Sequence, residues 1–178
     1  MQNEVQKLKE QSIKTYNDIL QNLSDGVFLY GAGFVGKWSV TFLERLGIKI
    51  NGFIDSDKRK WGKTVAGKII FSPKDTTVIN AKIILITSRH AVPLIRKQLA
   101  SLPAHILSVD AFTVHHQSLE VVEQIESLLS HDQKSLDNFY AILSCMLSGY
   151  KTKLSRTADN LPFFNEFGFF NSDGETFV

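Results

Sequence analysis

Cysteine and clustered histidine are scarce in this sequence. Cys145 is the single cysteine among 178 residues, which excludes an internal disulfide and a metal site with several cysteine ligands. Because Cys145 lies within an apolar pattern of helical spacing, we expect it to be a core residue. His115 and His116 are adjacent, and adjacent side chains diverge on a helix and face opposite ways on a strand. They make a poor metal-binding pair, and we predict no metal site.

Long hydrophobic runs and an excess of charge of one sign are also missing. The longest strongly apolar stretch, residues 82–87, is far too short to span a bilayer, and the N-terminus has no basic and apolar signal pattern. The 20 Lys and Arg residues nearly balance the 18 Asp and Glu residues and are scattered along the chain. We therefore expect a cytoplasmic protein with neither a membrane nor a nucleic acid as partner.

The sequence also lacks a recognisable set of catalytic residues. The sequence shows no paired carboxylates, no nucleophile elbow and no cluster of histidine and cysteine. It therefore predicts no catalytic residue, and a function in binding is favoured over chemistry.

The residues that are present predict one main α/β domain. With 43% hydrophobic residues, the chain can bury one ordinary core but not two. Short apolar runs such as 27–30 and 82–87 are typical of strands buried on both faces of a parallel sheet. Because helical patterns alternate with these runs, we predict a doubly wound parallel sheet of the Rossmann-like type. The expected strands are 27–30, 48–54, 69–71, 82–87 and 105–109, and the expected helices between them are 38–46 and 91–102.

Amphipathic patterns flank this domain on both sides. Residues 5–23 predict an N-terminal helix, and two further patterns between 119 and 147 predict a C-terminal helical hairpin. The tail contains six phenylalanines without regular periodicity, and so many aromatic side chains need a cover. We divide the chain into a leading helix (1–24), an α/β domain (25–112), a helical connector (113–151) and an aromatic tail (152–178).

A glycine-rich turn follows the first expected strand. Gly31, Gly33 and Gly36 have the spacing of the dinucleotide-binding fingerprint, which needs a tight turn, room for a phosphate and close helix packing at these places. The following helix directs its free N–H groups at the same point, where they stabilise an anion. Asp55 ends the second strand, and a carboxylate there usually accepts hydrogen bonds from a ribose or a base. The alternative is a tight turn in a domain without a ligand, with Asp55 as a turn cap.

Other polar residues are expected at the same edge of the sheet. Asp57 is an alternative acceptor to Asp55. The loop that follows carries Lys58, Lys60, Trp61 and Lys63. This loop either closes over a phosphate or sugar or forms a solvated face. Ser88 and His90 can reach a ligand, although Ser88 is favoured as the cap of the following helix. The candidate ligand-binding residues are Gly31, Ala32, Gly33, Phe34, Val35, Gly36, Asp55, Ser56, Asp57, Lys63, Ser88 and His90.

Several of these residues belong to a pattern that resembles a known domain. The pattern consists of Tyr30-Gly31-Ala32-Gly33, Gly36, Gly52-Phe53-Ile54-Asp55-Ser56-Asp57, Trp61-Gly62-Lys63, and Gly67 before Ser72-Pro73. It looks like the N-terminal nucleotide-binding domain of FkbM-type methyltransferases and is similar to the small N-terminal domain of PglD-type sugar acetyltransferases. The resemblance implies that residues 25–112 bind a nucleotide or sugar nucleotide, with the glycines near the phosphates and Asp55 near the ribose or base.

The C-terminal part carries a second resemblance. Residues 127–156 and the aromatic tail look like the helical connector of FkbM-type proteins and the lead-in to their methyltransferase fold. The sequence stops before the acidic and glycine-rich motif that binds S-adenosylmethionine in that family. The resemblance implies a binding module whose methyltransferase domain is missing downstream.

Three other functions fit the same residues. The glycine turn and Asp55 suit NAD in an oxidoreductase fragment, with the acid disfavouring a 2′-phosphate. Methyltransferases also place an acid after their second strand, so the unit itself is a candidate for S-adenosylmethionine, although Tyr30 stands before the first glycine. The third function is a pure interaction domain that forms a homodimer through the helices between 119 and 147.

Overall fold

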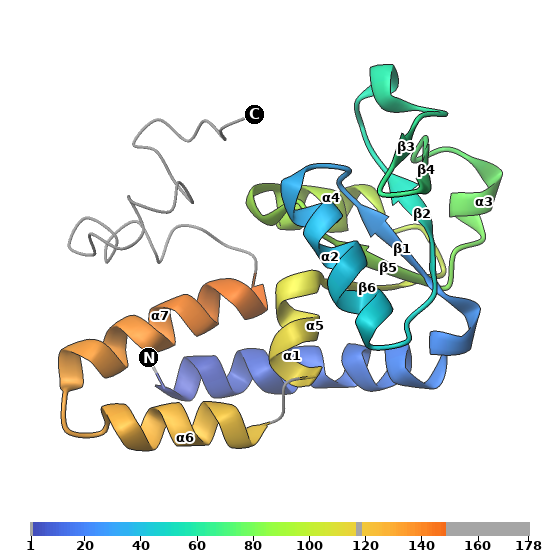
Figure 1. Ribbon diagram of the computed structural model, residues 1–178. Coiled ribbons are helices and arrows are strands. Elements are labelled where there is room, and N and C mark those ends of the chain that lie inside the picture. Colours follow the sequence, from blue (N-terminus) through green and yellow to red (C-terminus); the bar gives the residue numbers. More distant parts are fainter. Residues whose placement is uncertain (1, 117–118, 149–178) are drawn as a thin grey trace.

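Six strands form one sheet in the computed structural model, which describes residues 2–116 and 119–148 (Figure 1). The strand order is β3-β4-β2-β1-β5-β6, and every neighbouring pair is parallel except β3 and β4. The strands are β1 (Val27–Tyr30), β2 (Ile50–Ile54), β3 (Thr64–Val65), β4 (Lys68–Phe71), β5 (Ile83–Ile86) and β6 (His105–Ser108). The expected doubly wound, Rossmann-like fold is confirmed by this order, which reverses direction between β1 and β5.

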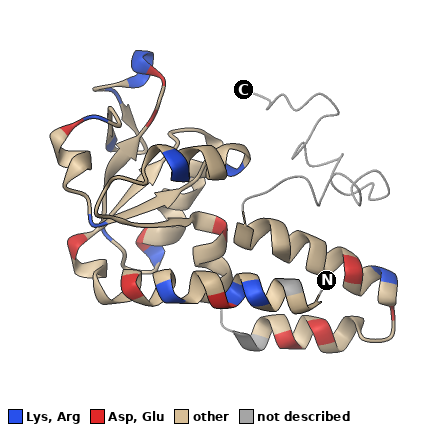
Figure 2. Cartoon of the chain, turned by 180° about the vertical axis from the view of Figure 1, so that it is seen from behind, with Lys and Arg blue, Asp and Glu red and all other residues tan. Residues whose placement is uncertain are grey.

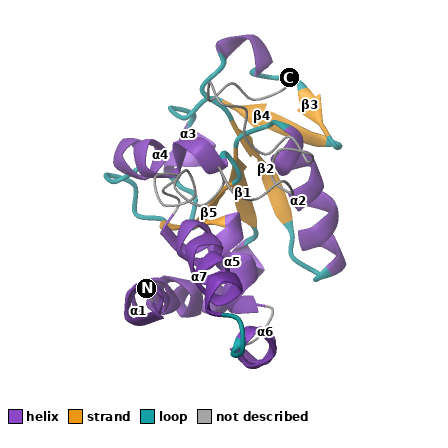
Figure 3. Cartoon of the chain, turned by 90° about the vertical axis from the view of Figure 1, so that its left-hand side faces the viewer, coloured by secondary structure: helices purple, strands orange, loops and turns teal. Residues whose placement is uncertain are grey.

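Helices cover both faces of the sheet (Figure 3). The α-helices are α1 (Gln2–Gln21), α2 (Phe34–Arg45), α3 (Thr76–Ile79), α4 (Val92–Gln98), α5 (Val109–His116), α6 (Leu119–Leu129) and α7 (Gln133–Ser148). Short 3-10 turns are η1 (Leu23–Asp25), η2 (Lys58–Lys60) and η3 (Arg89–Ala91). None of the helices within the described ranges is long and apolar enough to cross a membrane.

The apolar strands divide their side chains between two cores. Leu29 and Leu85 point into one cluster, which includes residues of α1, α2, α5 and α7. Tyr30 and Ile86, one residue further along each strand, point into a second cluster under α3 and α4. Successive strand side chains face opposite sides, so a continuous apolar run is buried on both faces. This burial is why residues 27–29 and 83–86 have apolar side chains without exception.

The segment 56–68, expected as a loop, contains additional structure. β3 and β4 form an antiparallel hairpin at the edge of the sheet. Its turn residues Ala66 and Gly67 have φ angles of 48° and 73°, the left-handed conformation that tight hairpins require at both central positions. The expectation of a loop was wrong because β3 has two residues, too few to show a periodic pattern.

The helices at the two ends of the described chain pack together with the sheet. α5 runs through residue 112, the position that we predicted as a domain boundary. Ser108 starts this helix by accepting a hydrogen bond from the Ala111 N–H at 3.1 Å, and Phe112 is fully buried. α1 lies against α5, α7 and β6 (Figure 1). These helices and the sheet therefore share one core, which follows from the large apolar faces of α1 and α7.

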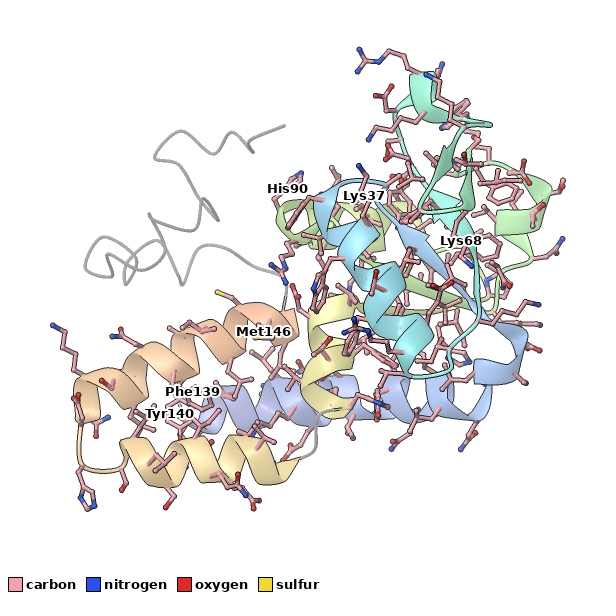
Figure 4. All side chains as sticks on the ribbon, viewed as in Figure 1. Lys37, Lys68, His90, Phe139, Tyr140 and Met146 are labelled. Atoms are coloured by element: carbon pink, nitrogen blue, oxygen red, sulfur yellow. The ribbon has the colours of Figure 1, made fainter. Side chains whose placement is uncertain are left out.

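The predicted C-terminal hairpin is present as α6 and α7. Phe139 and Tyr140 on α7 lie on the side of the helix that faces α1 and α6 (Figure 4). Cys145, expected in the core, is half-buried on α7. Leu128 on α6 is 80% exposed. The aromatic tail predicted for 152–178 lies outside the described residues.

Histidines at the end of α5 hold α1. The His115 ring Nε2 lies 2.6 Å from the Ser12 hydroxyl, and the His116 ring Nδ1 lies 3.1 Å from the Tyr16 hydroxyl. Burial lowers the pKa of His115 below its ordinary value, and the charge of Lys9 lowers it further. The folded protein therefore binds a proton at His115 less readily than the unfolded chain does.

We predict that acid weakens the attachment of α1 through His115. The unfolded chain takes up this proton first, so the stabilisation is present above the unfolded pKa of 6.5 and is lost as the pH falls below it. The free energy of unfolding, measured with urea, should fall from about pH 7.5 to about pH 5.5. His115→Gln should flatten this dependence. Parallel curves for the wild type and the variant would contradict the assignment.

Candidate functional site

The carboxyl ends of the central strands meet at one edge of the sheet. Tyr30 is paired in register with Ile54 on one side and with Ile86 on the other. Gly31, Asp55 and Thr87, each the next residue after its strand, are therefore brought to the same place. The crevice between β1 and β5 is the topological switch point, where open α/β sheets bind their ligands.

The three glycines of the turn meet three different requirements. Gly31 has a φ of +113°, which side-chain-bearing residues rarely adopt, and a Cβ there would lie 3.0 Å from the Thr87 hydroxyl. A Cβ on Gly36 would collide with the Gly31 carbonyl and would lie 2.9 Å from the Phe53 ring. A Cβ on Gly33 would have no atom of the described residues within 4 Å. The tight turn and the close packing of the fingerprint are thus present, and Gly33 faces open space.

The start of α2 presents backbone donors to that open space. Lys37 N–H donates to the Gly33 carbonyl at 3.0 Å, which is the first bond of the helix. The N–H groups of Phe34, Val35 and Gly36 precede this bond and so have no acceptor within the helix. The helix dipole adds a partial positive charge of about half a unit at the same end. The turn is therefore suited to an anion.

Asp55 binds the turn directly. One carboxylate oxygen, Oδ2, accepts the Ala32 N–H at 3.0 Å and the Lys60 ammonium at 2.9 Å. The other, Oδ1, accepts the Asp57 N–H at 2.9 Å. Asp55 is 8% exposed, so its charge is compensated by these three donors and not by water. A carboxylate has about four acceptor positions, which leaves one position open on Oδ1.

The loop after Asp55 is fixed to the sheet. The Trp61 indole N–H donates to the Asp55 carbonyl at 2.7 Å, and the Trp61 side chain packs on the first core cluster. Gly62 N–H donates to the Ile70 carbonyl at 2.9 Å, which fastens the loop to β4. These bonds place η2 and Lys60 beside the end of β2. The loop projects from the sheet, with lysine and arginine at its tip (Figure 2).

The other expected acceptor, Asp57, has a different partner. Its carboxylate accepts both the backbone N–H and the guanidinium of Arg59, at distances between 2.9 and 3.0 Å. The hydrogen bond from the Arg59 side chain, together with that from its backbone, lowers the pKa of Asp57 to about 2. Asp57 therefore caps η2 and stays ionised, while Asp55 makes the contact with the glycine turn.

Thr87 and Tyr30, which are not among the ligand-binding residues predicted from the sequence, form hydrogen bonds beside the crevice. The Thr87 hydroxyl lies 2.7 Å from the Gly31 carbonyl oxygen and 2.9 Å from that of Tyr30, so it holds the ends of β1 and β5 together. The Tyr30 hydroxyl donates to Gln98 Oε1 at 3.0 Å and lies 2.9 Å from the Ser56 hydroxyl. Ser56 is thus near the turn but engaged by Tyr30. Sequence spacing gave no signal for these partners, since they come from separate strands and helices.

The prediction that the Ser88 side chain caps the following helix is wrong. The Ser88 side chain makes no capping hydrogen bond, because η3 intervenes and α4 begins at Val92. Ser88 is half-buried, and a Cβ on Gly31 would lie 3.2 Å from its backbone nitrogen. His90 is exposed and lies at the same edge of the molecule as Lys37 of α2 (Figure 4). Lys63 is exposed on the loop after η2.

No metal centre is found at this edge within the described parts of the chain. Residues 2–116 and 119–148 contain no group of three His, Cys, Asp or Glu side chains arranged to hold a metal. A cavity of about 380 Å³ lies elsewhere, between α1, α4, β6 and α7, with Ser12, Thr15 and Ile106 among its lining residues. The glycine turn is instead an open surface bounded by Phe34 and Lys60.

Comparisons with known proteins found a matching family model and similar solved structures. Residues 23–106 match the family model described as C2185-like, N-terminal. Among solved structures, UDP-D-quinovosamine 4-dehydrogenase from Vibrio fischeri is 27% identical, with a TM-score of 0.40, over 51% of this chain and 84% of that chain. No curated protein matches the sequence.

Two substitutions in the turn should differ in their effect on stability. Gly36→Ala places a methyl group against the Gly31 carbonyl and the Phe53 ring, and should lower the free energy of unfolding by about 1–3 kcal/mol despite its better helix propensity. Gly33→Ala meets open space at a φ of −100° and should change it by less than about 0.5 kcal/mol. Urea unfolding of both variants tests the geometry. A stable Gly36→Ala protein would contradict the close packing.

Proposed function

We propose that residues 25–112 bind a nucleotide or sugar nucleotide through the glycine turn. The observation that carries this proposal is the open face at Gly33, where the first N–H groups of α2 are directed at a space free of described protein atoms. A phosphate at this point accepts hydrogen bonds from the backbone and is stabilised by the helix dipole. No basic side chain is required, but Lys37 of α2 adds positive charge at the same edge of the molecule as His90 (Figure 4).

Aromatic side chains beside the turn support a ligand that has a sugar or a base. Phe34, the first residue of α2, is 83% exposed, and Trp38, one turn further, is 51% exposed. The Trp38 ring stacks on Phe42 with 5° between the planes, which holds it as a flat surface. Such exposed apolar faces favour stacking with bases and with the apolar faces of sugars.

The proposed role of this site is recognition on behalf of a methyltransferase. The described residues bring no nucleophile and base together at the turn, and the carboxylate at this edge is used to hold the turn. The matching family model is described as N-terminal, which agrees with a module that precedes another domain. An FkbM-type methyltransferase domain beyond the binding module would supply the chemistry and the S-adenosylmethionine site.

Titration calorimetry tests the binding proposal. The chain should bind UDP-sugars more tightly than NAD or S-adenosylmethionine, and Gly33→Val should weaken that binding at least about tenfold, because its side chain fills the space of the phosphate. The matched control is Thr41→Val, which introduces valine at an exposed position of α2. This variant should bind UDP-sugars as the wild type does.

The titration also distinguishes the rival functions. Tightest binding of NAD would favour the oxidoreductase fragment, and tightest binding of S-adenosylmethionine would favour a cofactor site within the domain. If none of the three ligands binds to folded protein, the proposal is contradicted and an interaction domain is favoured. Thermal unfolding of each variant shows whether a loss of binding reflects a loss of fold.

The same proposal predicts that the 178-residue chain alone transfers no methyl group. A purified preparation incubated with labelled S-adenosylmethionine and sugar or nucleotide acceptors should give no product above the protein-free background, because the residues at the turn bind and do not catalyse. Methyl transfer that scales with the amount of clean protein would contradict this role.

A further inference from the structure

Lys60 pairs with Asp55, the carboxylate at the end of the second strand, at 2.9 Å. In Rossmann-type sites the acid at the end of the second strand accepts the ribose hydroxyls. Here Asp55 Oδ2 already accepts the Ala32 N–H and the Lys60 ammonium, so both lone pairs of that oxygen are in use. A ribose hydroxyl can bond to Oδ2 when Lys60 leaves it.

The arrangement gives Lys60 a short path to a phosphate at the turn. Its ammonium and the Ala32 amide share one oxygen, so Lys60 lies at the border of the phosphate position and the ribose position. The backbone beneath it is fixed by Trp61 and by β4, while its side chain is 40% exposed. A lysine on a fixed backbone keeps four rotatable carbons and can exchange one anionic partner for another.

We propose that Lys60 determines the specificity of this site for phosphorylated nucleotides by exchanging Asp55 for a ligand phosphate. The inference rests on the proposed nucleotide-binding function. When a diphosphate lies at the start of α2, the ammonium turns to it and forms a charge-assisted hydrogen bond. Asp55 Oδ2 is then released to accept a ribose hydroxyl. A nucleoside without phosphate offers Lys60 no new partner, so the ion pair stays in place and only the remaining position on Oδ1 is open to the ribose.

A purely structural ion pair makes a different prediction. If Lys60 serves to hold the loop, its removal loosens the site and lowers the affinities for nucleotides and for nucleosides in parallel. If Lys60 exchanges partners, its removal lowers the affinity for phosphorylated ligands and at the same time frees Asp55 for the ribose of a nucleoside. The ratio of the two affinities separates these cases, because a general loss of structure cancels in the ratio.

The experiment titrates UDP, uridine, ADP and adenosine into the full chain by calorimetry, with nucleosides measured by competition where they bind weakly. In Lys60→Met, which keeps the carbon stem, the preference for diphosphate over nucleoside should fall at least about tenfold, with nucleoside binding unchanged or tighter. Lys74→Met removes an exposed lysine that follows β4 and should keep the wild-type ratio. Lys60→Gln, neutral but able to donate to Asp55, gives the same comparison if Lys60→Met does not fold.

The outcomes separate this inference from the proposed function. A wild-type ratio in the folded Lys60 variants would overturn the exchange and leave the nucleotide site in place. Parallel weakening of both ligand classes would also overturn it and would make Lys60 a structural residue. Absence of binding of all four ligands to folded wild-type protein would overturn both the exchange and the nucleotide site.

Discussion

The hydrogen bond from the Ala32 amide to the Asp55 carboxylate joins the ends of β1 and β2 at the edge where the candidate site lies. The carboxylate is almost fully buried, and a buried charge is stable when several donors compensate it. Two of these donors are the backbone N–H groups of Ala32 and Asp57, and the third is Lys60. The conformation of the glycine turn, the start of the next loop and the position of the lysine thus all depend on one side chain.

This constraint explains why the site is organised before any ligand binds. The turn is held from beneath by Thr87, from the side by Asp55 and from behind by the contact of Gly36 with the Gly31 carbonyl. A turn fixed on three sides keeps the donors of α2 in place, so little conformational entropy is lost when a phosphate arrives. Gly33, the position in the turn where a side chain would meet no described atom, faces open space.

The helices α1, α5, α6 and α7 belong to a different part of the molecule. They lie away from the glycine turn, which is at the opposite end of α2 from this layer (Figure 1). α1 contacts β6, α5 and α7, so the first and last described helices stabilise each other across most of the sequence.

The sequence by itself determined the α/β class, the strand positions and the glycine turn, because each depends on local spacing: apolar runs bury on two faces, and three glycines meet fixed steric needs. It did not reveal the β3–β4 hairpin, whose first strand is too short for a pattern, or α5, which a buried Phe112 places on the core. It also predicted that Ser88 caps the next helix, but η3 intervenes and the Ser88 side chain makes no capping hydrogen bond. Tertiary structure alone decided that Asp55 holds the turn and that Lys60 pairs with the same carboxylate. Such partners are chosen by the register of parallel strands and the path of a loop, which no spacing along the chain expresses.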